Sequence, residues 1–311
     1  MNDDNSLDIL RTVKNKEFVY HRRGAAVVDK DTLCRIKKLH IPPKWTNVKI
    51  SSSDTDYLQA IGSDAKGRVQ YLYHPTWIAL SKIEKYNRLK LFAKKLPLLM
   101  KCVNKTVSGS INLANKEYII SLIFRILEKT HSRIGNDHFA EENNTYGLTT
   151  LLKKHLSISG NTISLSFVGK KSVKQKLIFT DKLCCDVLKE LKKIPGDRLF
   201  KTKDLDPIVS GDMNSYMKNI IGDDFTAKDF RTYAANDLFL KSLVQKDVPT
   251  SASQIKKVVN ECFDEVAAEL GHSRSICKTS YVMAIIPEKY TEDPTGFVAK
   301  NPTLDDIFKL Y

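Results

Sequence analysis

The sequence predicts an α+β fold with two domains. A small β-rich domain is expected over residues 1–80, and a larger, mainly α-helical domain with a small three-stranded sheet over residues 81–311. Up to residue 73, short runs of β-branched and aromatic residues are separated by turn residues, as in antiparallel strands. After residue 75, long segments carry apolar residues at helical spacing. Gly160-Asn161 interrupts them with the signal of a tight hairpin turn. A length of 311 residues suits one large domain or two ordinary ones.

The N-terminal domain is expected to contain four strands. Gly62–Gly67, with the sequence GSDAKG, has the composition of a turn between two of them. Ile41–Trp45 contains paired prolines, which hold the chain extended, so a rigid connector is expected there. The domain boundary is expected near residues 78–86, where no Gly/Ser linker occurs. The expected strands are Glu17–Tyr20, Val48–Ser52, Tyr57–Ile61 and Arg68–Tyr73.

The hairpin around this turn carries side chains suited to nucleic acid. Cations, an amide and phenols are the groups that contact phosphates and base edges. The same residues also suit a solvated hairpin with ordinary cross-strand tyrosine pairs, and the residues alone leave both interpretations open. The candidates for DNA contacts are Lys66, Arg68, Gln70, Tyr71 and Tyr73.

The second domain is expected to carry helices before and after its three strands along the chain. The strongest helical pattern is Tyr118–Ile134, with Arg133 at its C-terminal end before a Gly135-Asn136 stop. Thr226–Asp229 has the signature of a helix N-cap, and Arg231 lies in the first turns of the helix that it opens. Further helices are expected over residues 75–105, 183–194, 210–220 and 253–270, strands over 157–159, 162–168 and 175–179, and a polar tail over 288–311 with one short helix near Asp305.

Charge and composition narrow the class of protein. The chain has 50 Lys+Arg against 36 Asp+Glu, a net charge of +14, which favours a polyanionic partner such as nucleic acid. The acidic N-terminus does not resemble a signal peptide, and no apolar run is long enough for a membrane span. The six cysteines show no zinc-binding spacing and are expected to be reduced thiols. No phosphate-binding loop is present, so ATP use is not expected. No metal or other cofactor is expected either.

The segment Leu270–Tyr281, LGHSRSICKTSY, carries the most informative pattern. An amphipathic helix is expected to stop at Gly271, with His272 directly after it and Tyr281 nine residues later on a short helical segment. Both side chains can then point at one place. A phenol, with a pKa of about 10, is a poor nucleophile near neutral pH, but it reacts when the electrophile is polarised and the phenolate is stabilised. The segment alone also fits a histidine at a helix end and a buried tyrosine.

Other residues of the second domain complete a candidate active site. Arginine side chains bind non-bridging phosphate oxygens in bidentate fashion, and fixed cations stabilise the more negative transition state of phosphoryl transfer. A lysine at the tip of a hairpin can donate a proton to a leaving oxygen. A lysine at such a turn is also common as an ordinary solvent-exposed residue. No carboxylate pair at metal-binding spacing stands out here, which argues against a two-metal nuclease. The residues predicted for phosphoryl transfer to tyrosine are Arg133, Lys170, Arg231, His272 and Tyr281.

Five segments resemble the poxvirus-type type IB DNA topoisomerases. GSDAKGRVQYLYHP lies in the N-terminal half, and THSRIGN, LSFVGKKS, AKDFRTYAAN and LGHSRSICKTSYV follow in the family's order. IPPKW and the YHP after the hairpin are more similar to the branch shared by bacteria and giant viruses. The resemblance covers residues 20–286. It implies the tyrosine recombinase and topoisomerase IB catalytic fold, with the two domains closing around double-stranded DNA as a C-shaped clamp.

The resemblance also implies a role for each catalytic candidate. Tyr281 matches the nucleophile that forms a 3′-phosphotyrosyl bond and releases a 5′-hydroxyl. Arg133 and Arg231 match the arginines that clamp the scissile phosphate, Lys170 matches the general acid, and His272 matches the residue that bonds a non-bridging oxygen. The phosphotyrosine keeps the energy of the broken bond. Strand swivelling, relaxation of supercoils of either sign, and resealing therefore need neither ATP nor metal.

The resemblance also implies DNA contacts, and the chain departs from the family at two places. The matching DNA contacts are Gln70, Tyr71 and Tyr73 in the hairpin, and Lys228 and Asn236 as supporting residues. Lys171 follows the hairpin lysine where poxvirus members carry an acidic residue, and the segment after Arg133, GNDHFAEEN, is more acidic than theirs. Because that segment helps to read the groove in the family, no strict short target sequence is implied for this chain.

Two alternatives remain beside a type IB topoisomerase. A tyrosine site-specific recombinase shares the fold and nearly the same five residues. Recombinases, however, typically carry a histidine three residues before the second arginine, where this chain has Lys228. A non-catalytic DNA-binding protein of the same fold would bind without becoming covalently attached. We expect a monomer that acts inside a cell and is not secreted. If the protein is viral, it is expected in a virion or a viral factory. If it is bacterial, it is expected in the cytoplasm with the nucleoid.

Overall fold

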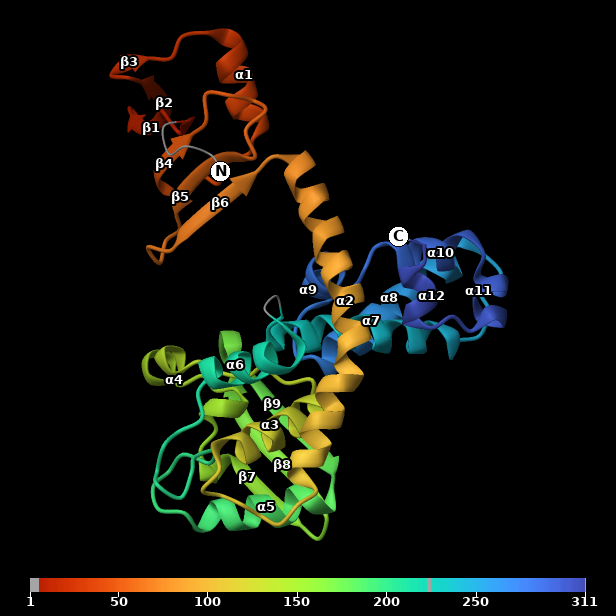
Figure 1. The fold of residues 1–311 in the computed structure, drawn as a ribbon. Helices are drawn as coiled ribbons and strands as arrows, with labels where there is room; N and C mark the ends of the chain where they lie inside the picture. The colour runs from red at the N-terminus through yellow and green to blue at the C-terminus, as the bar shows by residue number, and fades with distance from the viewer. Residues whose placement is uncertain (1–5, 223–224, 311) are drawn as a thin grey trace. The chain divides into compact units, whose positions relative to one another are not determined.

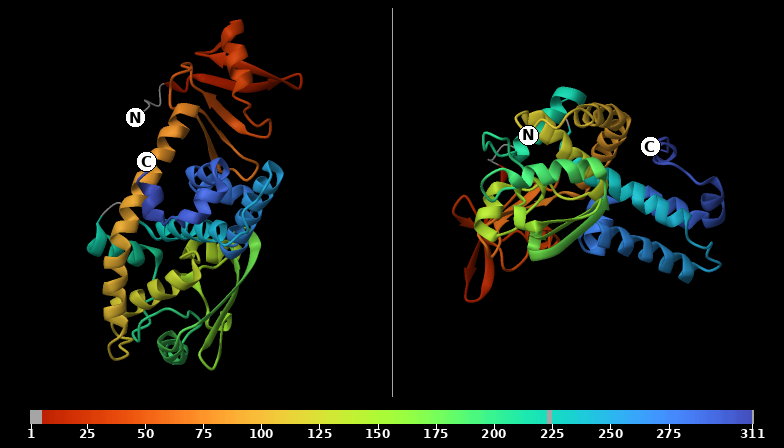
Figure 2. Two further views of the ribbon diagram at one scale, coloured as in Figure 1. Left: turned by 90° about the vertical axis from the view of Figure 1, so that its right-hand side faces the viewer. Right: turned by 90° about the horizontal axis from the view of Figure 1, so that it is seen from below.

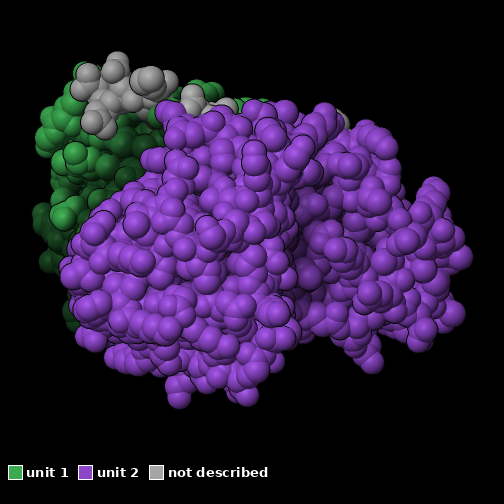
Figure 3. All heavy atoms as spheres, turned by 60° about the horizontal axis from the view of Figure 1, so that its bottom comes forward, with its two compact units in different colours: residues 1–86 green, residues 87–311 purple. Residues whose placement is uncertain are grey.

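A computed structural model describes residues 6–222 and 225–310 of the chain. By internal contacts the chain divides into two compact units, Met1–Tyr86 and Asn87–Tyr311 (Figure 3). The division falls inside a long helix, α2 (Pro75–Val107), and the predicted boundary at residue 80 lies in the same helix. Helix α2 therefore belongs in part to each unit.

Unit 1 is built on a six-stranded antiparallel sheet in the order β3-β2-β1-β4-β5-β6 (Figure 1). The first strand along the chain lies inside the sheet, because Ile9 stands opposite both Arg22 and Ile50. The prediction of a β-rich N-terminal domain is confirmed. The strands are β1 (Ile9–Lys14), β2 (Glu17–Arg22), β3 (Ala25–Ala26), β4 (Thr46–Ile50), β5 (Leu58–Ser63) and β6 (Val69–Tyr73).

Three elements of unit 1 were not predicted from the sequence: β1, β3 and the helix α1 (Lys30–Lys38). Each element is short and buries only one residue, Ile9 in β1 and Ile36 in α1, so each gives a weak signal in the sequence. Both residues nevertheless belong to the core of the unit, together with Val48, Ile50 and Ala60. The core of unit 1 therefore forms where one short helix packs on the sheet.

Unit 2 is mainly helical, as predicted. Beyond α2 its described helices are α3 (Lys116–Thr130), α4 (Asp137–Asn143), α5 (Lys182–Lys193), α6 (Ser210–Ile221), α7 (Ala227–Val244), α8 (Ala252–Glu269), α9 (Arg274–Ile276), α10 (Ile285–Glu292), α11 (Pro294–Lys300) and α12 (Leu304–Phe308). Short 3₁₀ turns occur at Leu148–Thr150, Lys153–His155 and Lys170–Ser172, and a π-helical turn at Cys277–Tyr281.

Helix α3 is the central element of unit 2. All residues from 118 to 124 are buried, so this helix is covered on every side rather than along one stripe. Phe124 stacks on Tyr216 of α6 with ring centroids 5.6 Å apart, and it packs against Phe230 of α7 at the same distance. The Arg125 guanidinium donates to Asp181, the N-cap of α5, at 2.8 Å. These contacts fix α5, α6 and α7, the last of which carries Arg231, to one central helix.

The small sheet of unit 2 has three antiparallel strands, β7 (Leu156–Ser159), β8 (Thr162–Gly169) and β9 (Val173–Thr180), in that order. The predicted turn at Gly160-Asn161 joins β7 to β8, and Gly160 has the left-handed φ of 58° that such a turn requires. Strands β8 and β9 pair along their full length. Helix α3 contacts β9 and α5 contacts β8 (Figure 1).

The predicted polar tail over residues 288–311 is wrong, because its described part folds into three short helices. Only α12, near Asp305, was expected. Tyr290 is completely buried and meets Phe297 edge-on, with ring centroids 5.5 Å apart. Helix α10 contacts α8, while α11 and α12 contact α7 (Figures 1 and 2). The few apolar residues are spread over helices too short for a periodic pattern, which explains the error.

Candidate active site

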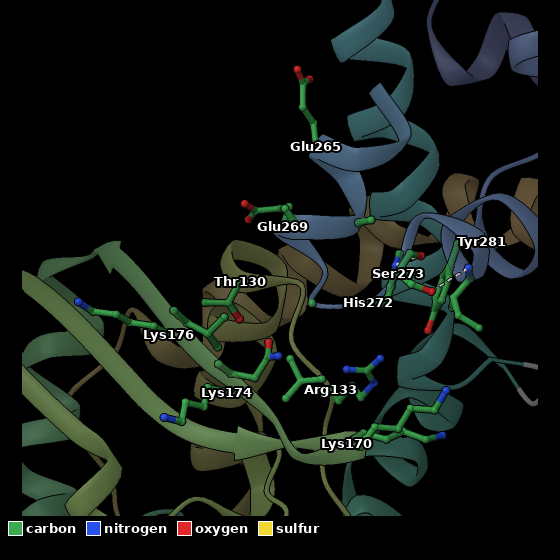
Figure 4. A pocket seen from close by; sticks show the side chains of 18 of the residues that line it. Thr130, Arg133, Lys170, Lys174, Lys176, Glu265, Glu269, His272, Ser273 and Tyr281 are labelled. Atoms are coloured by element: carbon green, nitrogen blue, oxygen red, sulfur yellow. Dashed lines mark hydrogen bonds between the residues drawn. The ribbon is translucent and has the colours of Figure 1, made fainter. Parts of the chain in front are cut away.

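A pocket of about 1240 Å³ in unit 2 brings the predicted catalytic residues together (Figure 4). Arg133, Lys170, His272 and Tyr281 line it, and they reach it from separate elements. Its lining is strongly positive, while two carboxylates of α8, Glu265 and Glu269, lie along one rim. The further lysines that line it are Lys129, Lys171, Lys174, Lys176 and Lys228. A polyanion is the ligand that this charge favours.

The start of α7 is held firmly. The Thr226 N–H donates to the Asp229 carboxylate at 2.7 Å, and the Asp229 N–H donates to the Thr226 carbonyl oxygen at 2.8 Å. Arg88 of α2 donates to both oxygens of the same carboxylate, at 2.7 and 3.2 Å. The N-cap signature is therefore confirmed, and it fixes the turn that carries Arg231.

Arg231 is buried, with 4% of its surface exposed. Its guanidinium donates to the carbonyl oxygen of His131, just after α3, and to that of Leu270, just after α8, the latter at 2.6 Å. Its Nε is buried and has no hydrogen-bond partner among the described residues. A buried donor without a partner is unfavourable, so this atom is left to bind an oxygen from outside the chain.

Arg133 does not stand in the helix where the sequence predicts it. Helix α3 ends at Thr130, and His131 takes a left-handed conformation with φ of 49°. Arg133 lies in the irregular segment that follows, where its carbonyl oxygen accepts a hydrogen bond from Leu148 N at 2.9 Å. The predicted helical position of Arg133 is wrong. The left-handed residue ends the helix early and leaves the His131 carbonyl to Arg231.

Lys170 stands at the tip of the β8–β9 hairpin, as predicted. Strand β8 ends at Gly169, and the turn continues through Lys171 and Ser172, both with left-handed φ values, 63° and 58°. The Lys170 side chain is exposed and makes no hydrogen bond or ion pair with another described residue. Its ammonium group is therefore available to a ligand in the pocket.

His272 lies flat against the ring of Tyr281, with centroids 4.7 Å apart and the planes 11° from parallel. Its Nδ1 lies 3.3 Å from the carbonyl oxygen of Ser273, which can only accept, so Nδ1 carries a proton. Burial lowers the pKa of His272, the bond to Ser273 opposes this, and Arg231 and Arg133 lower the pKa further. Its Nε2 is buried and has no hydrogen-bond partner among the described residues. The ring is thus neutral near pH 7 until an anion approaches Nε2.

Tyr281 ends the π-helical turn Cys277–Tyr281. The guanidinium carbon of Arg231 lies 5.8 Å from the centroid of its ring. Burial raises the pKa of the phenol, but Arg231, as a charge and as a hydrogen-bond donor, together with the charges of Arg133 and Lys228, outweighs burial, so the pKa of Tyr281 falls below its ordinary value. The site therefore stabilises the phenolate, the nucleophilic form, more than water does.

Asn236 does not sit where the resemblance implies a DNA contact. Its side chain is completely buried in α7. Its amide nitrogen donates to the carbonyl oxygens of Thr232 at 2.7 Å and Tyr281 at 3.0 Å, and its oxygen accepts from Met283 N at 2.7 Å. The implied DNA contact does not fit, because no part of the side chain reaches the surface. Asn236 instead holds the backbone on both sides of Val282, beside the predicted nucleophile.

In unit 1, the predicted DNA-contacting residues are organised by a carboxylate that the sequence did not single out. Asp64 accepts hydrogen bonds from the side chains of Arg68 at 2.8 Å and Gln70 at 3.1 Å, and from the Lys66 N–H at 2.9 Å. The bond from Arg68 is the main reason why the pKa of Asp64 falls to about 2. An Asp in a turn such as GSDAKG commonly binds the backbone ahead of it, which is the signal that could have identified Asp64.

The tyrosines of this hairpin are exposed. Tyr71 and Tyr73 are two residues apart on one face of β6, and their rings stack with centroids 6.1 Å apart. Their exposed fractions are 54% and 37%. Aromatic faces and cations presented together on a hairpin suit contact with nucleic acid.

The described part of the chain gives little evidence for a metal site, a membrane span or a reactive cysteine. No group of three or more His, Cys, Asp or Glu residues there is placed to hold a metal ion. None of the described helices combines the length and the apolar character that crossing a bilayer requires. The six cysteines are unpaired, and burial raises the pKa of Cys184 and Cys277 to about 12, so these two thiols are poor nucleophiles.

Comparison with known proteins identifies matches over most of the chain. The family model of the eukaryotic DNA topoisomerase I catalytic core matches residues 74–293, and that of the bacterial DNA topoisomerase IB N-terminal domain matches residues 17–64. DNA topoisomerase 1B of Acanthamoeba polyphaga mimivirus is 34% identical over 303 residues, which cover 93% of this chain and 89% of that protein. DNA topoisomerase I of monkeypox virus is 26% identical, over 80% of this chain and 78% of that protein.

Solved structures of the XerH site-specific recombinase bound to its DNA substrate are also similar. The post-cleavage complex aligns with a TM-score of 0.41 and 15% identity, over 65% of this chain and 51% of that chain.

Proposed function

Since the chain belongs to the type IB DNA topoisomerases, we propose that Tyr281 is the nucleophile by which it nicks one strand of double-stranded DNA. The enzyme relaxes supercoiled DNA by breaking, swivelling and resealing a strand, and the recombinase alternative is not favoured. The observation that carries the assignment is the convergence of Tyr281, His272, Arg133 and Lys170 on one positive pocket, with buried Arg231 beside the tyrosine ring.

In the first step, the Tyr281 oxygen forms a bond to the phosphorus as its proton passes to solvent. The bond from phosphorus to the 5′-oxygen breaks, and Lys170 gives a proton to that oxygen, which leaves as a hydroxyl. The lowered pKa of Tyr281 favours the attacking phenolate. Resealing reverses each transfer, and the phosphotyrosyl bond supplies the energy. Neither a nucleotide nor a metal is therefore required.

Arg231, Arg133 and His272 stabilise the phosphorane-like transition state in this proposal. Its non-bridging oxygens carry more negative charge than those of the ground state, so fixed donors bind the transition state better. The buried Nε of Arg231 and the buried Nε2 of His272, which lack partners among the described residues, supply two such donors. For Nε2 to donate, the imidazole must gain a proton, because Nδ1–H is already directed at Ser273.

We further propose that the enzyme acts as a monomer, with both units closing around the DNA as a clamp. The exposed hairpin residues of unit 1, together with Lys228 at the pocket, would contact the DNA. Phosphate contacts of this kind make binding weaken steeply with salt. The enzyme would work wherever the DNA of its host or virus is kept, in a virion, a viral factory or a nucleoid.

The proposal is tested with supercoiled plasmid in EDTA without ATP, comparing the wild-type protein with Tyr281→Phe. Relaxation by the wild type alone is expected, while the variant keeps its affinity for DNA. If both proteins relax the plasmid, Tyr281 is not the nucleophile. If neither does, the assay contradicts the mechanism for this substrate, and paired recombination sites become the next substrate.

A further inference from the structure

One glutamine lies between two glycines, each of which directly precedes a predicted catalytic residue. Gly169 precedes Lys170, and Gly271 precedes His272. A Cβ atom on Gly271 would lie 2.6 Å from both Nε2 and Oε1 of Gln175 and 2.9 Å from its Cδ, so the end of the Gln175 amide points at Gly271. A Cβ atom on Gly169 would lie 3.0 Å from Cγ of the same side chain. The stem of Gln175 thus packs on the lysine hairpin, and its head packs on the histidine turn.

The position of Gln175 on β9 explains how it spans the two segments. Gln175 stands opposite Phe167 of β8, two residues before Gly169. Its side chain is half-buried, whereas those of Lys174 and Lys176 on the other face of the strand are exposed. All three residues line the pocket. Gln175 makes no side-chain hydrogen bond with another described residue, so its contribution within the described chain is packing.

A Cβ atom at either glycine would push the Gln175 side chain from this position. Gly271 has a left-handed φ of 60°, which ends the helical turn, and its missing side chain leaves the space that the amide fills. Gly169 has an extended backbone, so its conformation does not require glycine. The close approach of the Gln175 stem is therefore the reason, in this structure, for a glycine at position 169.

We propose that Gln175 is a positioning residue that couples the Lys170 hairpin to the His272 turn. It holds the proton donor for the 5′-oxygen in register with the group that binds a non-bridging oxygen. The proposal rests on the proposed function of Lys170 and His272. Misplacing a catalytic group by about 1 Å can slow a reaction roughly a hundredfold, so a packing contact of this kind can control the rate.

The test uses single-turnover cleavage of two DNA duplexes by the full-length protein at saturating enzyme. The site is first mapped with the wild type, and the second duplex then carries sulfur in place of the 5′-oxygen at that site. A thiolate leaves without protonation, because thiols have a pKa of about 8.5. Gln175→Ala is expected to slow cleavage of the oxygen substrate roughly tenfold or more and that of the sulfur substrate clearly less. Equal loss on both substrates, or no loss, overturns the coupling to Lys170.

Two further variants separate packing from direct phosphate binding. Gln175→Met keeps the length of the side chain without the amide, and it is expected to restore most of the rate. If Gln175→Met is as slow as Gln175→Ala, the amide itself is required and the positioning role is wrong. In a His272→Ala background, Gln175→Ala is expected to cause no further loss on the sulfur substrate, and a full additional loss contradicts the coupling to His272.

The controls keep this inference separate from the proposed function. Gln245→Ala removes an exposed glutamine at the end of α7 and should leave both rates unchanged. If the wild type forms no covalent complex with either duplex, the proposed function fails. If the wild type cleaves both and Gln175→Ala matches it, the function stands and only the role of Gln175 is lost.

Discussion

The hairpin of unit 1 and the pocket of unit 2 present their proposed DNA-binding side chains in opposite ways. In the hairpin, Asp64 holds Arg68 and Gln70 through contacts that span at most six residues of chain. In the pocket, Arg231 is held by carbonyl oxygens 100 and 39 residues away. Exposed, local contacts can be exchanged for DNA without disturbing the fold, whereas the buried site is organised before DNA arrives. Changes in the hairpin should therefore alter binding, and changes in the pocket should alter chemistry.

The largest effect is expected for Arg231→Ala. Losing a preorganised donor to the transition state should slow cleavage roughly 10²–10³-fold, with little change in DNA affinity. Arg231→Lys should not restore the rate, because one ammonium group cannot reach both carbonyl oxygens and a phosphate. Single-turnover cleavage at saturating enzyme measures the loss. Arg68→Ala is the matched comparison and should weaken binding with little change in this rate. Equal slowing by both variants would break the contrast between the two regions.

A smaller effect is expected for Asn236→Ala. The substitution leaves the Tyr281 carbonyl and the Met283 N–H without their buried partner, so the free energy of unfolding should fall by about 1–3 kcal/mol. Cleavage should slow because the backbone that carries the nucleophile is less well held. Chemical denaturation and cleavage rates measure the two losses. If the variant instead loses DNA affinity and cleaves at the normal rate, the DNA contact implied by the resemblance is correct.

The pH dependence of DNA binding tests His272. The free ring has a lowered pKa, and a phosphate oxygen beside Nε2 should raise it, so the complex takes up a proton. Because the pKa is higher in the complex than in the free protein, affinity should rise as pH falls between the two values, by at most about tenfold per pH unit. Fluorescence anisotropy with Tyr281→Phe measures binding without cleavage. His272→Ala in that background should flatten the profile, and an unchanged slope would assign the proton to another group.

The smallest effect is expected for Asp64→Asn. Asn keeps an oxygen for the backbone of the turn but loses the charge that holds Arg68, whose side chain is 68% exposed in the pair. The freed Arg68 should make one more phosphate contact, so the slope of log affinity against log salt should steepen by about one. Asp31→Asn, at an exposed residue in the first turn of α1, makes the same change of charge away from the hairpin. The same steepening in both variants would show that net charge alone is responsible.

Elements were predictable where a local signal exists. The hairpin turn at Gly160-Asn161 and the cap at Thr226–Asp229 depend on residues a few positions apart, and the structure contains both. Strand β1 and the helices α1, α10 and α11 were missed, because each buries only one or a few side chains. Their positions depend on a core assembled from distant parts of the chain, such as Ile9 with Ile36 and Ile50.

The sequence by itself determined the family and the five catalytic candidates, because chemistry depends on residue types that recur in short motifs. The tertiary structure alone decided which way these and neighbouring side chains face. It turned Asn236 inward onto the backbone of Tyr281, placed Arg133 beyond the end of α3, and set Gln175 between Gly169 and Gly271. The physical reason is distance along the chain. Each of these placements depends on packing or hydrogen bonds that no local pattern of residues specifies.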